Sequence, residues 1–147
     1  MTTRRRADPE MTALIDALGA VGLFSGLPKK KLQLIAEMCR PHMFAAGEDI
    51  VTQGDSSGRF YLIIDGGAEV RVNGRAVNIL GPGQYFGEFA VIDQEPRSAS
   101  VVATTAVRTH SLASITLRPL LREEPEITYR LLLNACQRLR ATQNNFG

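Results

Sequence analysis

Turn-forming residues recur at close intervals between residues 44 and 112, and this feature constrains the fold more than any other. They lie at Gly54-Asp55, Asp65-Gly66-Gly67, Asn73-Gly74 and Gly81-Pro82-Gly83. Such punctuation is typical of short strands joined by tight turns, and Asn-Gly is the dipeptide most typical of a two-residue hairpin. In the strand before Asn73-Gly74, apolar and charged residues alternate over 68–72, which predicts a half-buried strand. We therefore expect an antiparallel sandwich or barrel of the jelly-roll type.

Helical patterns lie on both sides of this strand-rich region. Apolar residues recur at helical spacing over residues 11–18, 32–38 and 127–139, and a short helix is expected over 115–121. These patterns predict a flexible tail over residues 1–10 and one domain over 11–147. Within the domain we expect helices over 11–43, a β-roll over 44–113 and C-terminal helices over 114–144.

Composition fits one compact cytoplasmic domain. The chain has 147 residues, of which 44% are hydrophobic, so a core of useful size is expected. A net charge of +2 gives no general attraction to nucleic acid. The sequence has no apolar run of membrane-spanning length and no secretory signal, and its two cysteines form no disulfide framework.

One segment, residues 83–101, combines polar groups that suit an anionic ligand. Its residues 86–92 are apolar apart from Glu88 and favour a turn or two of helix. The first backbone N–H groups of a helix have no partner within the helix and favour an anion. A second loop then leads to Arg97 and to the hydroxyl of Ser98. The segment thus supplies free amides, a carboxylate, a guanidinium and a hydroxyl.

These groups together fit a nucleotide with one singly charged phosphate and a free 2′-hydroxyl. A guanidinium pairs with phosphate through two parallel hydrogen bonds, and one arginine with backbone amides suits about one negative charge. A triphosphate would normally need a Gly-rich loop ending in Gly-Lys-Ser/Thr and magnesium, and the sequence lacks this loop. A carboxylate beside phosphate is repulsive unless the ligand donates a hydrogen bond to it, as a ribose hydroxyl can. A 3′,5′-cyclic nucleotide has both groups.

Two stretches of this segment resemble a known family. Phe86-Gly87-Glu88-Phe89-Ala90 and Pro96-Arg97-Ser98-Ala99-Ser100-Val101 are similar to the phosphate-binding cassette of cyclic-nucleotide-binding domains. Such domains occur in catabolite-activator-type transcription factors, cAMP-dependent kinase regulatory subunits and nucleotide-gated channels. With residues 47–55 and 61–66, the resemblance covers roughly residues 23–139. It implies an α+β fold that is mainly β, in which helices pack on an antiparallel β-roll of about eight strands.

The resemblance also implies a ligand and the residues that bind it. The ligand would be cAMP in preference to cGMP, held without a cofactor or a metal. Glu88 would accept the 2′-hydroxyl, and Arg97 would neutralise the phosphate. Ser98 and backbone amides would complete the cradle, which comprises Phe86, Gly87, Glu88, Phe89, Ala90, Arg97, Ser98 and Ala99.

The base would lie between apolar positions of the roll and the last helix, which acts as a lid. The implied apolar positions are Val70, Val77 and Leu80, for which a core role is equally compatible. On the helix the implied contacts are Arg138 and Thr142, although an exposed helix cation is an equally good interpretation of Arg138. Movement of this helix would transmit occupancy to a partner.

Two functions of other classes stay open. The chain could be a scaffold or dimerisation module with an unused cassette, whose last helix pairs with an effector protein or a second copy. It could also be the sensor half of a DNA-binding regulator, although the chain contains no recognisable DNA-binding module. An enzyme has no support, because no catalytic motif is present and His42 and His110 are the only histidines available for a metal site.

Overall fold

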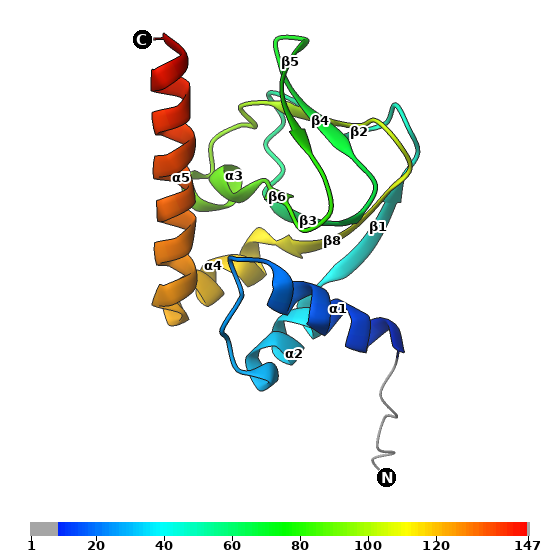
Figure 1. Ribbon diagram of the computed structural model, residues 1–147, viewed down its shortest axis with the longest axis vertical. Helices are drawn as coiled ribbons and strands as arrows, with labels where there is room; N and C mark the ends of the chain where they lie inside the picture. The colour runs from blue at the N-terminus through cyan, green and yellow to red at the C-terminus, as the bar shows by residue number, and fades with distance from the viewer. Residues whose placement is uncertain (1–8, 147) are drawn as a thin grey trace.

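Two four-stranded antiparallel sheets form the centre of the molecule (Figure 1). The computed structural model describes the backbone of residues 9–146 and the side chains of residues 9–141. The first sheet has the order β1 (Arg40–Phe44), β8 (Val107–Ala113), β3 (Arg59–Asp65) and β6 (Tyr85–Phe86). The second has the order β2 (Asp49–Val51), β7 (Ser100–Ala103), β4 (Ala68–Val72) and β5 (Arg75–Leu80). The predicted eight-stranded β-roll is confirmed.

The hairpin between β4 and β5 has the predicted turn. Val72 pairs with Arg75, which leaves Asn73 and Gly74 as a two-residue loop. Both loop residues have positive φ, 52° and 79°, as a type I′ turn requires. Beyond Ala68, however, β4 is half-buried at each position instead of alternating. One face of the strand borders an open pocket, so protein atoms do not fill the space beside it.

Within residues 9–146, five helices complete the domain: α1 (Pro9–Ala20), α2 (Lys29–Met38), α3 (Glu88–Asp93), α4 (Ser114–Glu123) and α5 (Pro125–Phe146). In Figure 1, α1 and α2 lie together at one end of the roll, and α5 runs along its side next to α3. A flexible tail was predicted over residues 1–10. Residues 1–8 lie outside the described residues, and Pro9 and Glu10 belong to α1.

The first helical region ends earlier than predicted. Helix was expected up to residue 43, but α2 ends at Met38 and β1 begins at Arg40. Pro41 is the physical reason: a proline lacks the N–H that would bond four residues back, and it disfavours helical geometry in the residue before it. Proline is tolerated in β1 because this strand is at the edge of its sheet.

Two hydrophobic clusters stabilise the fold. One joins the helices to the outer face of the first sheet, where Phe24 and Phe60 meet edge to face with ring centroids 6.4 Å apart. The other fills the inside of the roll, where the rings of Tyr61 and Phe86 stack at 5.2 Å. The helix α5 contributes Ile127 and Leu131 to the first cluster, which also contains Val91 of α3.

The apolar stripe predicted along the last helix packs only in part. Ile127 and Leu131 are buried, but Leu139 is 59% exposed. Of the apolar residues of α3, Val91 shares a cluster with Ile127 and Leu131, whereas Phe89 is 47% exposed. The part of α5 beyond Leu131 therefore depends on polar contacts for its position.

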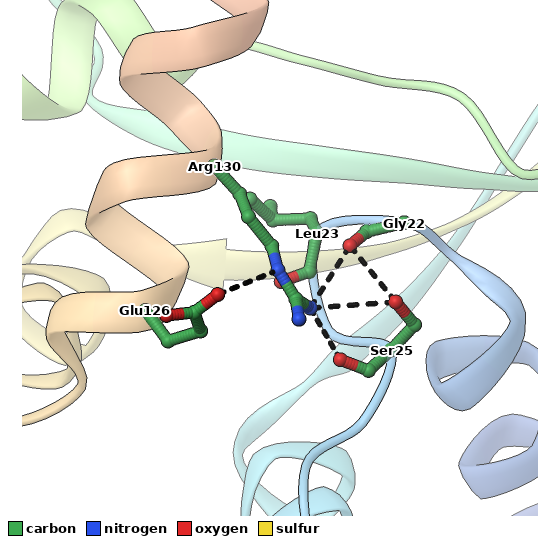
Figure 2. A network of polar contacts seen from close by, with 5 residues as sticks. All are labelled: Gly22, Leu23, Ser25, Glu126 and Arg130. Carbon is green, nitrogen blue, oxygen red and sulfur yellow. Dashed lines mark hydrogen bonds and ion pairs between the residues drawn. The ribbon is translucent and has the colours of Figure 1, made fainter.

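Arg130 fixes the lower part of α5 to the connection between α1 and α2. Figure 2 shows its guanidinium among backbone carbonyls of that connection. Nη1 donates to the carbonyls of Gly22 at 3.1 Å, Leu23 at 3.4 Å and Ser25, and Nε pairs with Glu126 at 3.5 Å. The carbonyl contacts tie the lower part of α5 to the connection between α1 and α2, while the pair with Glu126 lies within α5.

Candidate functional site

A pocket of about 580 Å³ opens between the second sheet, the segment that contains α3, and α5. Residues of β4, β5 and β7 form its floor, and the loop from α3 to β7 forms one wall. Among the side chains of α5 up to residue 141, those of Arg138 and Ala141 also border it. The predicted cassette and base-pocket residues that line it are Val70, Val77, Leu80, Phe86, Gly87, Glu88, Phe89, Ala90, Arg97, Ser98, Ala99 and Arg138.

The helix α3 begins at Glu88 with Gly87 as its N-cap residue, and the turn or two of helix expected within residues 86–92 is present. Gly87 has φ of 94°, a left-handed conformation that favours glycine. A Cβ at this position would lie 2.4 Å from the carbonyl oxygen of Arg59 and 2.7 Å from Nη1 of Arg97. Only glycine therefore allows the chain to turn here while the Arg97 side chain passes beside it.

Both the main chain and the side chain of Arg97 form hydrogen bonds with backbone groups of other residues. Its N–H donates to the carbonyl of Asp55 at 2.7 Å, and its own carbonyl accepts from the N–H of Gly54 at 2.9 Å. Its Nη2 donates to the carbonyl of Arg59 at 2.7 Å, and Nη1 donates to that of Gly87 at 3.4 Å. Arg97 is only 5% exposed, and burial lowers its pKa.

Glu88 is a buried carboxyl group in the first turn of α3. The residue is 5% exposed, and this burial raises the pKa of Glu88 against the opposing effect of Arg138 and Arg97. Its Oε1 accepts a hydrogen bond from Nη1 of Arg138 at 3.0 Å. Its Oε2 is buried and has no partner among the described residues.

Residues of α5 reach the pocket from the other side. Arg138 contacts Glu88, and its guanidinium also lies 5.6 Å from the ring centroid of Tyr85. One turn earlier, the side-chain amide of Asn134 donates to the hydroxyl of Tyr85. The helix is thus joined to β6 and α3 by polar contacts at the pocket.

The arrangement suits a ligand that carries both a negative charge and a hydroxyl donor. Nε of Arg97 and Oε2 of Glu88 are buried polar atoms without a partner in the described part of the chain. Buried polar atoms left without a hydrogen bond are costly, so each would gain from a complementary ligand group. A phosphate oxygen suits the first and a hydroxyl suits the second.

The remaining predicted residues differ in how far they are buried. Ser98 is exposed at the pocket wall, and Ala99 is half-buried. Of the predicted base-pocket residues, Leu80 is buried, Val70 is half-buried, and Val77 is 57% exposed although it lines the pocket. The side chain of Thr142 lies outside the described residues.

Sequence reasoning missed several residues of the site. Tyr85 is buried against the pocket, and Asn134 reaches it from α5. The spacing of Asn134 and Arg138, four residues apart on a helix, is a signal that both face the same side. The carbonyl of Arg59 could not be found in this way, because its contact with Arg97 depends on how two distant segments meet.

Groups for other chemistry are not assembled in the described residues. There, no cluster of three or more His, Cys, Asp or Glu side chains could hold a metal ion. His42 lies away from the pocket lining and shares a hydrogen bond with Ser111 at 2.9 Å. Burial raises the pKa of Cys39 to about 12, which suits a packing role. From residue 9 to residue 146, none of the helices has the length and apolarity needed to cross a membrane.

A known protein family matches most of the roll. The model of the family described as "Cyclic nucleotide-binding domain" matches residues 41–124, which include Glu88 and Arg97. The match extends from β1 to the end of α4. It therefore contains both sheets and the helix α3.

Similar proteins include a transcriptional regulator and a kinase regulatory subunit. The CRP-like cAMP-activated global transcriptional regulator of Mycobacterium tuberculosis is 31% identical over 139 residues, which cover 90% of this chain and 61% of the regulator. The cAMP-dependent protein kinase regulatory subunit of Schizosaccharomyces pombe is 41% identical over 92 residues, which cover 62% of this chain and 22% of the subunit. The chain thus spans less than two thirds of either relative.

A solved structure supports the fold. The catabolite activator protein of Thermus thermophilus superposes with a TM-score of 0.75 and 29% sequence identity. The superposition covers 84% of this chain and 61% of that protein. This chain therefore shares its β-roll with flanking helices with that protein.

Proposed function

Because this chain belongs to the cyclic nucleotide-binding domain family, we propose that its pocket binds a 3′,5′-cyclic nucleotide, with cAMP preferred over cGMP. One observation carries the proposal: Glu88 and Arg97 are both buried at the pocket, and each keeps a polar atom without a partner among the described residues. An unused cassette would have no reason to keep two such groups. This observation favours ligand binding over a purely structural scaffold.

Each group has a role that its chemistry suits. Arg97 pairs with the cyclic phosphate, and the first amides of α3 donate to the same phosphate. Oε2 of Glu88 accepts the hydrogen bond of the ribose 2′-hydroxyl. Ser98, exposed at the wall, is in a position to donate its hydroxyl to the phosphate.

The apolar side of the pocket receives the base. Val70, Val77 and Leu80 line the pocket together, and Tyr85 adds a buried aromatic ring. The preference for cAMP is supported by the relatives, whose names describe a cAMP-activated regulator and a cAMP-dependent kinase subunit. The docking of α5 beside this pocket suggests that the helix transmits occupancy to a partner.

Calorimetric titration of the purified protein tests the proposal directly. Three ligands are compared in the presence of EDTA: cAMP, cGMP and 5′-AMP, the last of which has an open phosphate with more charge. We expect one site per chain, tighter binding of cAMP than of cGMP, and the weakest binding for 5′-AMP. A flat trace with both cyclic nucleotides at high protein concentration would overturn the proposed function.

A further inference from the structure

Arg138 and Glu88 form an ion pair across two elements that are 50 residues apart in the chain. The pair is asymmetric, because the side chain of Arg138 is 46% exposed while that of Glu88 is 7% exposed. Arg138 therefore approaches from the mouth of the pocket, and Glu88 accepts from within the protein. The resemblance implied that Arg138 contacts the base, with an exposed helix cation as an equally good interpretation. In the structure its guanidinium lies on the Glu88 carboxylate and lines the pocket.

The two oxygens of Glu88 have different environments. Oε1 is occupied by Arg138, and Oε2 is buried without a partner in the described part of the chain. A carboxylate that is bonded at one oxygen cannot rotate freely about its last torsion. The contact with Arg138 thus fixes which oxygen is left for a donor on the ligand.

The charge of Glu88 also depends on its neighbours. Three groups face it: Arg138 from α5, Arg97 from the loop before β7, and Tyr85 from β6. Burial raises the pKa of Glu88, and both arginines lower it. An ionised carboxylate accepts a hydrogen bond from a hydroxyl more strongly than a neutral acid does.

We propose that Arg138 is a positioning residue that orients Glu88 from α5, so that Oε2 accepts the 2′-hydroxyl of the bound ribose. The proposal rests on the proposed function. If Arg138 has this role, the carboxylate of Glu88 takes part both in recognition of the ribose, through Oε2, and in docking of α5, through Oε1. Ligands without a 2′-hydroxyl should therefore gain little from Arg138.

The experiment compares Arg138→Gln with Arg140→Gln, which removes an exposed cation from the same helix. Affinities for cAMP and for 2′-deoxy-cAMP are measured for both variants and for the wild type. We expect Arg138→Gln to weaken cAMP binding by about fivefold, a moderate effect because Arg138 is half-exposed. Its affinity for 2′-deoxy-cAMP should stay close to that of the wild type, and Arg140→Gln should change neither.

A second measurement requires no nucleotide. Carboxyl NMR of the unliganded protein follows the pKa of Glu88, which should rise in Arg138→Gln and not in Arg140→Gln. An unmoved pKa, or an equal loss of affinity for both nucleotides, would overturn the positioning role while leaving the proposed function intact. A wild-type protein that binds neither nucleotide would overturn the proposed function and this role together.

Discussion

Arg97 donates a hydrogen bond of 2.7 Å from Nη2 to the backbone carbonyl of Arg59, 38 residues earlier in the chain. A backbone carbonyl at the start of a central strand is a rigid acceptor, so the guanidinium is oriented without help from a ligand. The main chain of Arg97 is also bonded to Gly54 and Asp55. A group that is fixed in advance loses little freedom on binding, which favours affinity.

Replacement of this arginine should abolish most of the affinity for cAMP. In Arg97→Leu we expect a loss of about 2–5 kcal/mol of binding free energy, because the phosphate would be left beside an apolar side chain. Arg97→Lys keeps the charge but not the paired donors, so its affinity for cAMP should lie between that of the wild type and that of Arg97→Leu. Titration calorimetry measures the effect, and thermal unfolding checks that the variants are folded. Wild-type affinity in Arg97→Leu would show that the phosphate binds elsewhere.

Gly87 should tolerate no side chain, unlike another glycine with similar geometry. Gly87→Ala places a Cβ 2.4 Å from the carbonyl oxygen of Arg59, and Gly83→Ala places one in open space. Both residues have positive φ, 94° and 83°, so both variants carry the left-handed strain of about 1–2 kcal/mol.

The backbone clash should make Gly87→Ala cost at least about 3 kcal/mol of unfolding free energy in total. Urea denaturation of both variants measures the difference. Equal losses in the two would show that the chain relaxes at Gly87 and that the close approach to Arg59 is not essential.

The buried carboxyl of Glu88 should make stability depend on pH in an unusual direction. Burial raises its pKa in the folded protein above the ordinary value of 4.5. Between the unfolded and folded pKa values the folded state binds more protons, so the unfolding free energy falls as pH rises through that interval. Glu88→Gln does not titrate, so its stability relative to the wild type should be greater at pH 7 than at pH 4.

Denaturation curves across this pH range measure the effect. Glu95→Gln is a matched control, since it changes an exposed carboxylate on the nearby loop. A relative stability of Glu88→Gln that is the same at pH 4 and pH 7 would contradict the assigned rise in pKa.

The two halves of α5 should respond differently to the same substitution. Leu131 is 5% exposed and Leu139 is 59% exposed, although both lie on the predicted stripe. Leu131→Ala should cost about 2–5 kcal/mol of unfolding free energy, because it opens a cavity in the cluster that contains Val91. Leu139→Ala should stay within about 0.5 kcal/mol of the wild type. A large loss in Leu139→Ala would show that the upper part of α5 also packs on the roll.

Much of this architecture could be predicted from local patterns. The Asn73-Gly74 hairpin and the start of α3 directly after Gly87 each follow from the conformational preferences of one or two residues. The presence of Glu88 and Arg97 at the same pocket was predicted from the family resemblance, which covers both residues. Which ligand groups they contact stays a prediction.

Other features depend on contacts between distant segments, which local patterns do not contain. The helical periodicity of the apolar residues in α5 was predicted correctly. Only those in its first half, Ile127 and Leu131, are buried against the rest of the domain, whereas Leu139 is exposed. From the sequence, a contact of Arg138 with Glu88 could not be distinguished from a contact with the base, because either contact would bring the guanidinium to the same pocket. The early end of α2 could have been predicted from the local sequence, because Pro41 disfavours helix in the residue before it.

The attachment of Arg130 to the connection around Gly22 and Ser25 makes the first turns of α5 a pivot (Figure 2). The helix continues for about 24 Å beyond this pivot, at about 1.5 Å per residue. It therefore has the proportions of a lever, on which each degree of tilt moves the last turn by about 0.4 Å. The pocket touches this lever near the middle, at Arg138, so a small displacement there is roughly doubled at Phe146 by geometry alone.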